Sequence, residues 1–298
     1  MQTTQEGLKR EVGVWGLSAN IVNIMVGAGI FVLPAIIAET MGASGVLAYL
    51  FCGLLIGLIM LCFAEAGSKV THSGGAYAYV ETAFGAYPGF LVSIFYMMAG
   101  VFSDAAVSNA LVEILGLISP VFKNPIARVI TLFLFFSGLA TLNVIGVKQG
   151  IGLVKITTVG KLIPLLLLIS LGWKDVQWIN LHWESTPTIQ QLGQTSLILF
   201  FAFMGGDAAL IIGGEIKNPQ KTIPRAIFIG ISSVLIIYIM IQLVSQGVLG
   251  DELPNFKEAP LAEAGKLILA RSDIPWFSSG QQFLCLGCLA VRSSIIQE

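Results

Sequence analysis

Two breaks inside long apolar runs are the first features that could do chemistry. The charge-free run 12–38 is long enough to cross a bilayer as one helix, yet "NIMVGAGIFVLP" within it holds Gly27, Gly29 and Pro34, which weaken or break helices. A half-helix that starts at 27–29 offers unpaired N–H groups and a positive dipole end to an anion, and the carbonyl groups that end the preceding half attract a cation. A zwitterion would fit both ends.

A second break lies in the apolar run 192–216, where Gly205 and Gly206 are followed by Asp207. Inside hydrocarbon each freed backbone N–H or C=O group is costly unless protein or trapped water satisfies it, so a broken helix is expected to line a buried cavity. The Asp207 carboxylate could satisfy exposed N–H groups, bind a cationic group of a substrate or take part in a proton path. The pair Gly53 and Gly57, in contrast, is expected to serve close helix packing.

Lys161 is a titratable group deep in a third apolar run. It lies about 16 Å from each end of the predicted span 150–172, which is farther than its stem can reach. Burial disfavours the ammonium form, so this amine is able to gain and lose a proton during a cycle. The structural alternative is a permanent counter-charge for Asp104, Asp207 or another acid.

Apolar helices must position these residues. The chain of 298 residues is 55% hydrophobic and 11% charged, which indicates an all-α integral membrane protein. Its formal net charge of −1 gives no reason to expect a nucleic-acid partner. We predict seven spans and a short eighth, at about 12–38, 44–66, 88–117, 126–146, 150–172, 192–216, 226–249 and 274–291. The string "APLAEAGKLILA" predicts a further short helix outside the membrane.

Lysine and arginine residues near the ends of the spans predict the orientation. One side of the membrane receives Lys9, Arg10, Lys69, Lys148, Lys155, Lys217, Lys221 and Arg225, against Lys123, Arg128 and Lys174 on the other. The positive-inside rule therefore places the N-terminus in the cytoplasm.

The spacing of the two breaks predicts an internal repeat. Gly29 and Gly206 lie 177 residues apart, and the breaks fall in the first and sixth spans, as an inverted five-helix repeat requires. We therefore predict one transmembrane domain over 1–298, with a first five-helix repeat at 12–174 and a second at 186–298. A second repeat of equal length would end at about residue 350, so we expect it to be incomplete.

Several long strings carry a family resemblance. They are "GAGIF" with the following Pro34, "AEAGSKVTHSGGAYAYVETAFG" from Ala64, "VGKLIPLLLLI" around Lys161 and "FFAFMGGDA…GGEIKNPQKTIPRAI" from Phe200. In these strings the chain resembles the amino acid–polyamine–organocation superfamily of transporters. The resemblance implies the five-plus-five inverted repeat of the leucine transporter.

The resemblance also implies site residues. The substrate's carboxylate is expected at Gly27, Ala28 and Gly29, and its amino group at carbonyl groups near Met25, Phe201 and Met204, beside the break at Gly205. Phe201 matches the position of a gating aromatic, although an ordinary core or lipid-facing Phe is the simpler alternative. Lys161 stands where sodium-coupled relatives hold sodium, and the family expects an acid at Asp207.

The function implied by this resemblance is secondary active transport of amino acids by a sodium-independent permease or exchanger in a plasma or bacterial inner membrane, with proton coupling through Lys161. The alternatives are a polyamine or amine transporter, or a truncated fragment that does not transport. No enzyme motif is present. Cys285 and Cys288 have metal-ligand spacing, but with no second Cys or His pair near them we expect neither a metal nor a cofactor.

Overall fold

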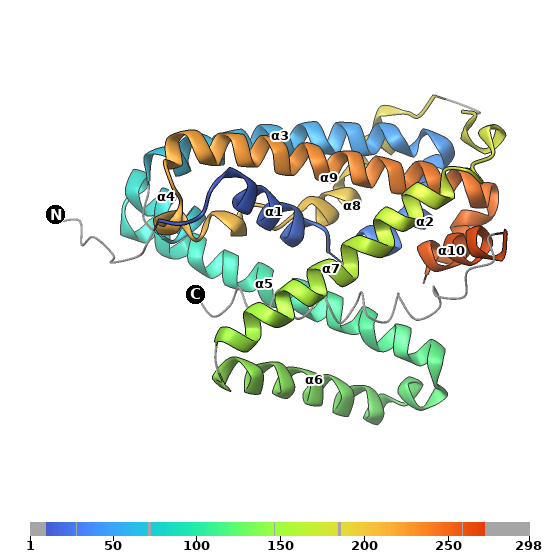
Figure 1. Ribbon diagram of the computed structural model, residues 1–298, viewed down its shortest axis with the longest axis horizontal. Coiled ribbons are helices and arrows are strands. Elements are labelled where there is room, and N and C mark those ends of the chain that lie inside the picture. Colours follow the sequence, from blue (N-terminus) through green and yellow to red (C-terminus); the bar gives the residue numbers. More distant parts are fainter. Residues whose placement is uncertain are drawn as a thin grey trace. The chain divides into compact units, whose positions relative to one another are not determined.

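The computed structural model describes residues 10–27, 29–70, 73–145, 147–183, 186–257 and 259–271. Its secondary structure is helical, apart from one isolated β-bridge between Val12 and Ile216 among these residues. The α-helices are α1 Val14–Met25, α2 Gly29–Met41, α3 Val46–Lys69, α4 Gly75–Phe84, α5 Ala86–Ile118, α6 Pro125–Ile145, α7 Val147–Gly172, α8 Ile189–Phe203, α9 Pro219–Leu249 and α10 Pro260–Arg271 (Figure 1).

The apolar runs do form helices. Four helical stretches of the described chain are long and apolar enough to cross a membrane: Gly29–Lys69, Ala86–Asn109, Ile189–Leu210 and Pro219–Phe256. The first predicted span is α1 followed by α2, interrupted at the predicted place, and the short helix predicted around 259–270 is α10. The predicted eighth span, 274–291, lies outside the described residues, as do Cys285 and Cys288.

Two parts of the fold differ from the sequence prediction. We predicted a span over 192–216, but α8 ends at Phe203 and the following residues form turns and the short 3-10 helices Ala208–Leu210 and Gly213–Glu215. Glycine is conformationally permissive and costly in helix interiors, and four of the residues after α8 are glycines, so the helix does not resume. In addition, α4 is a helix that the sequence analysis did not propose.

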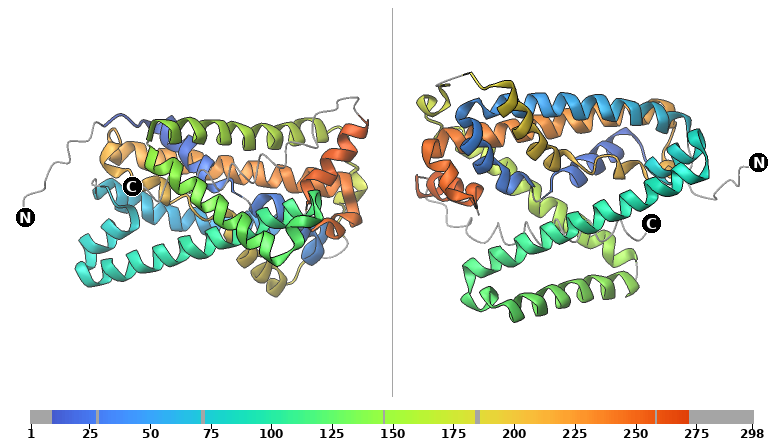
Figure 2. Two further views of the ribbon diagram at one scale, coloured as in Figure 1. Left: turned by 90° about the horizontal axis from the view of Figure 1, so that it is seen from below. Right: turned by 180° about the vertical axis from the view of Figure 1, so that it is seen from behind.

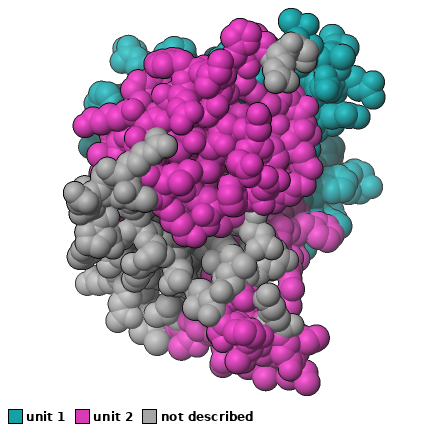
Figure 3. Space-filling view, turned by 90° about the vertical axis from the view of Figure 1, so that its right-hand side faces the viewer, with its two compact units in different colours: residues 1–29, 44–98, 185–240 teal, residues 30–43, 99–184, 241–298 magenta. Residues whose placement is uncertain are grey.

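The chain divides into two compact units (Figure 3). The first unit consists of residues 1–29, 44–98 and 185–240, and the second of residues 30–43, 99–184 and 241–298. The first unit therefore holds α1, α3, α4, α8, the beginning of α5 and most of α9. The second holds α2 after Gly29, the rest of α5, α6, α7, α10 and the end of α9.

In the first unit, α1 runs parallel to the beginning of α9. Val12 pairs with Ile216, Oγ of Ser18 donates a hydrogen bond to the carbonyl of Ala226 (3.2 Å), and a β-carbon added at Gly230 would lie 2.7 Å from Cγ2 of Ile21. The residue numbers of both partners increase from one contact to the next, so the two helices run in the same direction.

The first unit also contains α3, which lies beside α8 and α9 (Figures 1 and 2). A β-carbon at Gly53 would lie 2.6 Å from Cδ1 of Leu235, whereas Gly57 has no atom within 4 Å of its added β-carbon. Only the first of these two glycines therefore serves the close packing that we expected of both.

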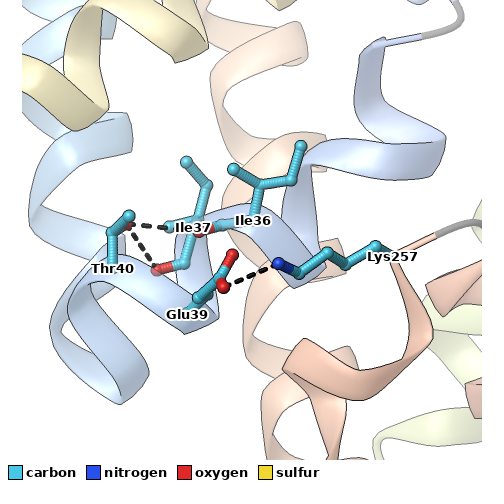
Figure 4. A network of polar contacts seen from close by, with 5 residues as sticks. All are labelled: Ile36, Ile37, Glu39, Thr40 and Lys257. Carbon is cyan, nitrogen blue, oxygen red and sulfur yellow. Dashed lines mark hydrogen bonds and ion pairs between the residues drawn. The ribbon is translucent and has the colours of Figure 1, made fainter.

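In the second unit, α10 packs against α7, where Gly172 faces Val244 and Ile268. The last turn of α2 is joined to the segment before α10 by an ion pair, because Nζ of Lys257 lies 2.6 Å from Oε1 of Glu39 (Figure 4). Both side chains are about half exposed, so the pair is accessible to solvent ions.

Candidate functional site

The first break separates α1 from α2. Met25 is the last residue of α1 and Gly29 the first of α2. The N–H of Val26 still donates to the carbonyl of Val22, but the N–H of Gly27 turns back to the carbonyl of Met25 at 2.7 Å. The free N–H groups at the start of α2 are therefore those from Gly29 onward. Ala28 lies outside the described residues.

The second break follows α8. Met204 is the capping residue after Phe203, and Gly205 adopts a φ of +97°, a conformation that side chains with a β-carbon rarely take. The N–H of Ala208 donates to the carbonyl of Gly205 at 3.1 Å, which starts the first 3-10 turn. The end carbonyl groups of α8 consequently have no N–H donor from a following helical turn.

The two breaks touch one another within the first unit. A β-carbon added at Gly29 would lie 3.2 Å from Cα of Ala202 and 3.4 Å from Cδ1 of Phe201. One added at Gly206 would lie 2.9 Å from Sδ of Met25. Glycine therefore lets the start of α2 approach the backbone of α8 at Ala202, and lets the second break pack against the Met25 side chain.

Tyr238 of α9 joins the breaks directly. Its side chain is fully buried, and its Oη lies 2.7 Å from the carbonyl oxygen of Met25 and 2.8 Å from that of Ala202. Its ring makes edge-to-face contacts with Phe203, at 5.0 Å between centroids, and with Tyr49, at 6.5 Å. A phenol has one hydrogen, so Tyr238 can donate to only one of the two carbonyl groups at a time.

The structure brings together Met25, Gly29, Phe201 and Gly205 of the predicted site. The added β-carbon of Gly205 would meet Cγ2 of Ile24 at 3.0 Å, one residue before Met25. Met25 is buried, whereas the side chains of Phe201 and Met204 are 41% and 50% exposed. Gly27 lies in the same break, half-buried.

The two ionisable residues of the predicted site, Asp207 and Lys161, lie in different units. Asp207 is half-buried and directly precedes the Ala208–Leu210 turn, which its side chain does not cap. Lys161 lies in α7 of the second unit, and its side chain is only 1% exposed. Pro164, three residues later, lacks the N–H that would otherwise bond the carbonyl of Gly160.

Sequence reasoning missed Tyr238, although a signal was present. Tyr238, Gln242 and Ser245 follow one another at helical spacing in the apolar run 226–249, so they share one face of α9. A polar stripe of this kind inside a membrane helix indicates an interior-facing side.

The arrangement offers hydrogen-bond acceptors from the ends of α1 and α8 and the N–H donor of Gly29, all inside the first unit. Among the described residues, no group of three or more His, Cys, Asp or Glu side chains could hold a metal ion. The chemistry available there is the binding of a small polar or zwitterionic molecule by backbone groups.

Comparison with known proteins gives the family. A family model described as amino acid permease matches residues 12–289. The chain is 29% identical over 308 residues to the serine/threonine exchanger SteT of Bacillus subtilis, covering 97% of this chain and 67% of that protein. It is 32% identical over 254 residues to the Asc-type amino acid transporter 1 of Mus musculus, covering 78% of this chain and 46% of that protein.

A third relative is the cadaverine/lysine antiporter of Escherichia coli, 26% identical over 289 residues, with 94% of this chain and 64% of the relative covered. The chain thus spans between 46% and 67% of the length of these three relatives. The family match covers nearly all of the described helices, both breaks included, and agrees with the resemblance that the sequence strings carry. The chain belongs to the amino acid permease family.

Proposed function

We propose that this integral membrane protein is a permease or exchanger that moves amino acids across the bilayer, and that the two helix breaks form its substrate site. The observation that carries the proposal is the contact between the breaks, where Tyr238 lies between the end carbonyl groups of α1 and α8. The relatives named as an exchanger, a transporter and an antiporter support the same activity.

The substrate's amino group would bind at the carbonyl oxygen of Met25, while Tyr238 stays bonded to Ala202. The carbonyl oxygen of Met25 already accepts from Gly27 and can accept from Tyr238, which together use its two lone pairs. If the single proton of Tyr238 turns to Ala202, one lone pair of Met25 becomes free for a substrate ammonium. An incoming amino group would thus replace the tyrosine without leaving either carbonyl unsatisfied.

The substrate's carboxylate would bind on the other side of the first break, at Gly27–Gly29. The start of α2 supplies unpaired N–H groups and the positive end of a helix dipole, which together favour an anion. The N–H of Gly27 is used inside the break, so Gly29 is the first donor of the described chain that is available there.

The remaining features complete the proposal. The fold would be a five-plus-five inverted repeat with the N-terminus in the cytoplasm of a plasma or bacterial inner membrane, as the positive-inside rule indicates. Phe201, which is partly exposed beside Gly29, would act as a gating aromatic. Asp207 would contact a cationic group of the substrate or an ion.

Lys161 would couple transport to protons in place of sodium. The burial of its side chain, which is 1% exposed, supports this role. Lys161→Ala should flatten the pH dependence of uptake while substrate binding largely survives, and Lys161→Arg should act as a permanently charged form. Uptake by Lys161→Ala with an unchanged pH profile would refute the coupling role.

A second candidate function is the transport of amines, which the cadaverine/lysine antiporter among the relatives favours. The two candidates differ in whether the substrate needs a carboxylate. Binding of matched pairs to the purified chain, lysine against cadaverine and serine against ethanolamine, separates them. For an amino acid permease the decarboxylated member should bind about 10–150-fold more weakly, because hydrogen bonds to a charged group are worth about 1.5–3 kcal/mol.

Equal binding of both members of each pair would refute the carboxylate assignment and favour an amine carrier. Uptake into liposomes by the purified 298-residue chain tests the activity itself, and its absence would favour a form that binds substrate without transporting it.

A further inference from the structure

We propose that the first unit carries a binding surface for anionic phospholipids where α9 begins. The surface combines a basic stripe, Lys217, Lys221 and Arg225, with an aromatic ridge, Tyr77, Phe84 and Tyr87. It goes beyond substrate transport and rests only on the cytoplasmic orientation of this end, which belongs to the proposed function.

Two charges of the basic stripe are neighbours on α9, and the third, Lys217, lies just before the helix. The residues of the stripe are spaced four apart, Lys221 and Arg225 lie in the first two turns of α9, and all three side chains are exposed. Side chains four residues apart on a helix are neighbours, about 5–6 Å apart at their β-carbons. None of the three side chains makes a hydrogen bond or ion pair with another described residue.

The backbone holds the stripe in place. The N–H of Lys217 donates to the carbonyl of Val12 at 2.9 Å, and Oγ1 of Thr222 donates to the carbonyl of Lys217. The pairing of Val12 with Ile216 also brings the N-terminal segment next to the stripe, and the exposed Arg10 lies two residues before Val12. The neighbouring acids are Glu11, Glu215 and Glu81, the last hydrogen-bonded to Tyr77, so four cations stand against three carboxylates and the surface stays positive.

The position of the cations is unfavourable without a counter-ion. Lys221 occupies the first turn of α9, where the positive end of the helix dipole repels a cation. A phosphate group bound between the side chains would relieve both this repulsion and the repulsion among the three charges.

The basic stripe lies directly beside an apolar surface of α9, as a binding site for a lipid headgroup would. Phe228 lies one turn after Arg225 on the same side of α9, and its side chain is 72% exposed. Along α9 the surface therefore changes from basic to apolar within about 5 Å, as it does between the headgroups and the acyl chains of a bilayer. A nucleic acid or an acidic protein would not match the apolar part.

The aromatic ridge lies beside the stripe. The N–H of Gly74, before α4, donates to the carbonyl of Ile211, and a β-carbon at Gly67 would meet both Oη of Tyr79 and Cδ1 of Ile223 in α9. α4 therefore lies near the beginning of α9, at the same end of α9 in both views (Figures 1 and 2).

The outward face of α4 and the first turn of α5 carry the exposed ridge. Phe84 is 75% and Tyr87 73% exposed, and Tyr77 is also exposed. Aromatic side chains beside Lys and Arg are typical of surfaces that lie at the level of lipid headgroups.

The test uses the purified full chain in neutral detergent and measures lipid binding by native mass spectrometry and by thermal unfolding, without any transport assay. Phosphatidylglycerol is compared with phosphatidylcholine of the same acyl chains. We expect phosphatidylglycerol to bind more tightly by roughly fivefold for each stripe cation, hence about 100-fold, and the preference to fall at high salt.

The K217Q/K221Q/R225Q variant should lose this preference. The control K174Q/K257Q/K266Q removes the same charge from exposed lysines elsewhere, two of which are ion-paired with Glu39 and Glu263, and should keep the preference. Inorganic phosphate at the same concentration should not stabilise the chain, since it lacks acyl chains. Equal affinity for the two lipids in the unmodified chain, or an equal effect of free phosphate, would overturn the proposal even if the triple variant failed to fold.

Discussion

Replacing Tyr238 with Phe removes one hydroxyl group from the contact between the two helix breaks. The ring contacts with Phe203 and Tyr49 remain, because Phe has the same ring. The Met25 carbonyl keeps its bond from Gly27, whereas the Ala202 carbonyl loses its buried donor. The substitution therefore isolates the hydrogen bonding of Tyr238 from its packing.

The expected cost follows from these contacts. One hydrogen bond between membrane helices contributes about 0.6–1.7 kcal/mol, and a buried carbonyl left without a partner costs about 1–3 kcal/mol. We therefore expect Tyr238→Phe to lower the free energy of unfolding by about 1–3 kcal/mol, or the midpoint temperature by roughly 2–10 °C.

The assay can use a cysteine of the chain itself. Cys52 in α3 is fully buried and Cys62 is exposed, so a form with Cys52 as its sole cysteine reacts with a thiol dye only on unfolding. The matched control is Tyr79→Phe, since the buried Oη of Tyr79 has no hydrogen-bond partner among the described residues. Burial raises the pKa of Tyr79 to about 12, so this hydroxyl stays neutral in the assay. Equal midpoints for the two variants would refute the bridging role of Tyr238.

Three further outcomes follow from the packing. Gly29→Ala should weaken amino acid binding about 5–150-fold in a thermal-shift titration, because its β-carbon would push the breaks apart at an overpacking cost of about 1–3 kcal/mol. Gly27→Ala, whose β-carbon has no atom nearer than 3.8 Å, should bind normally. Gly230→Ala should lower the free energy of unfolding by about 1–3 kcal/mol in the same thiol assay, while Gly57→Ala should be neutral or slightly stabilising. If Gly57→Ala were the more destabilising of the two, the contact of α1 with α9 would be contradicted. Glu39→Gln should lower the free energy of unfolding by only about 0.2–1 kcal/mol, and only at low salt, because its partner Lys257 is half exposed. A larger or salt-independent loss of stability would show that the ion pair is shielded from water.

Charge-free runs predicted most of the helices, because a helix that crosses a bilayer must be predominantly apolar along its length. The break before Gly29 was predicted for the same reason, since glycines and a proline inside such a run leave few alternatives. α4 was not predicted, because its ten residues mix apolar, aromatic and polar types, and its packing against α3 and α9 is tertiary.

The composition of the site was harder to predict than its place. Contacts such as that of Gly29 with Ala202 join segments far apart in sequence, and no local pattern records them. Phe201, which precedes Ala202, was proposed from family resemblance, whereas Tyr238 was not proposed at all. Its role depends on two carbonyl groups that only the fold brings to one hydroxyl.

The pairing of α1 with α9 joins segments that leave the ribosome at different times. Tyr238 follows Met25 by 213 residues, so at about 5–20 residues per second α1 waits about 10–40 s for its partner. During that time Ser18, which is buried in the finished structure, cannot reach Ala226. We expect α1 to settle in the bilayer only after α9 has been inserted, so substitutions along this pair should reduce the yield of inserted protein more than the affinity of the molecules that do fold.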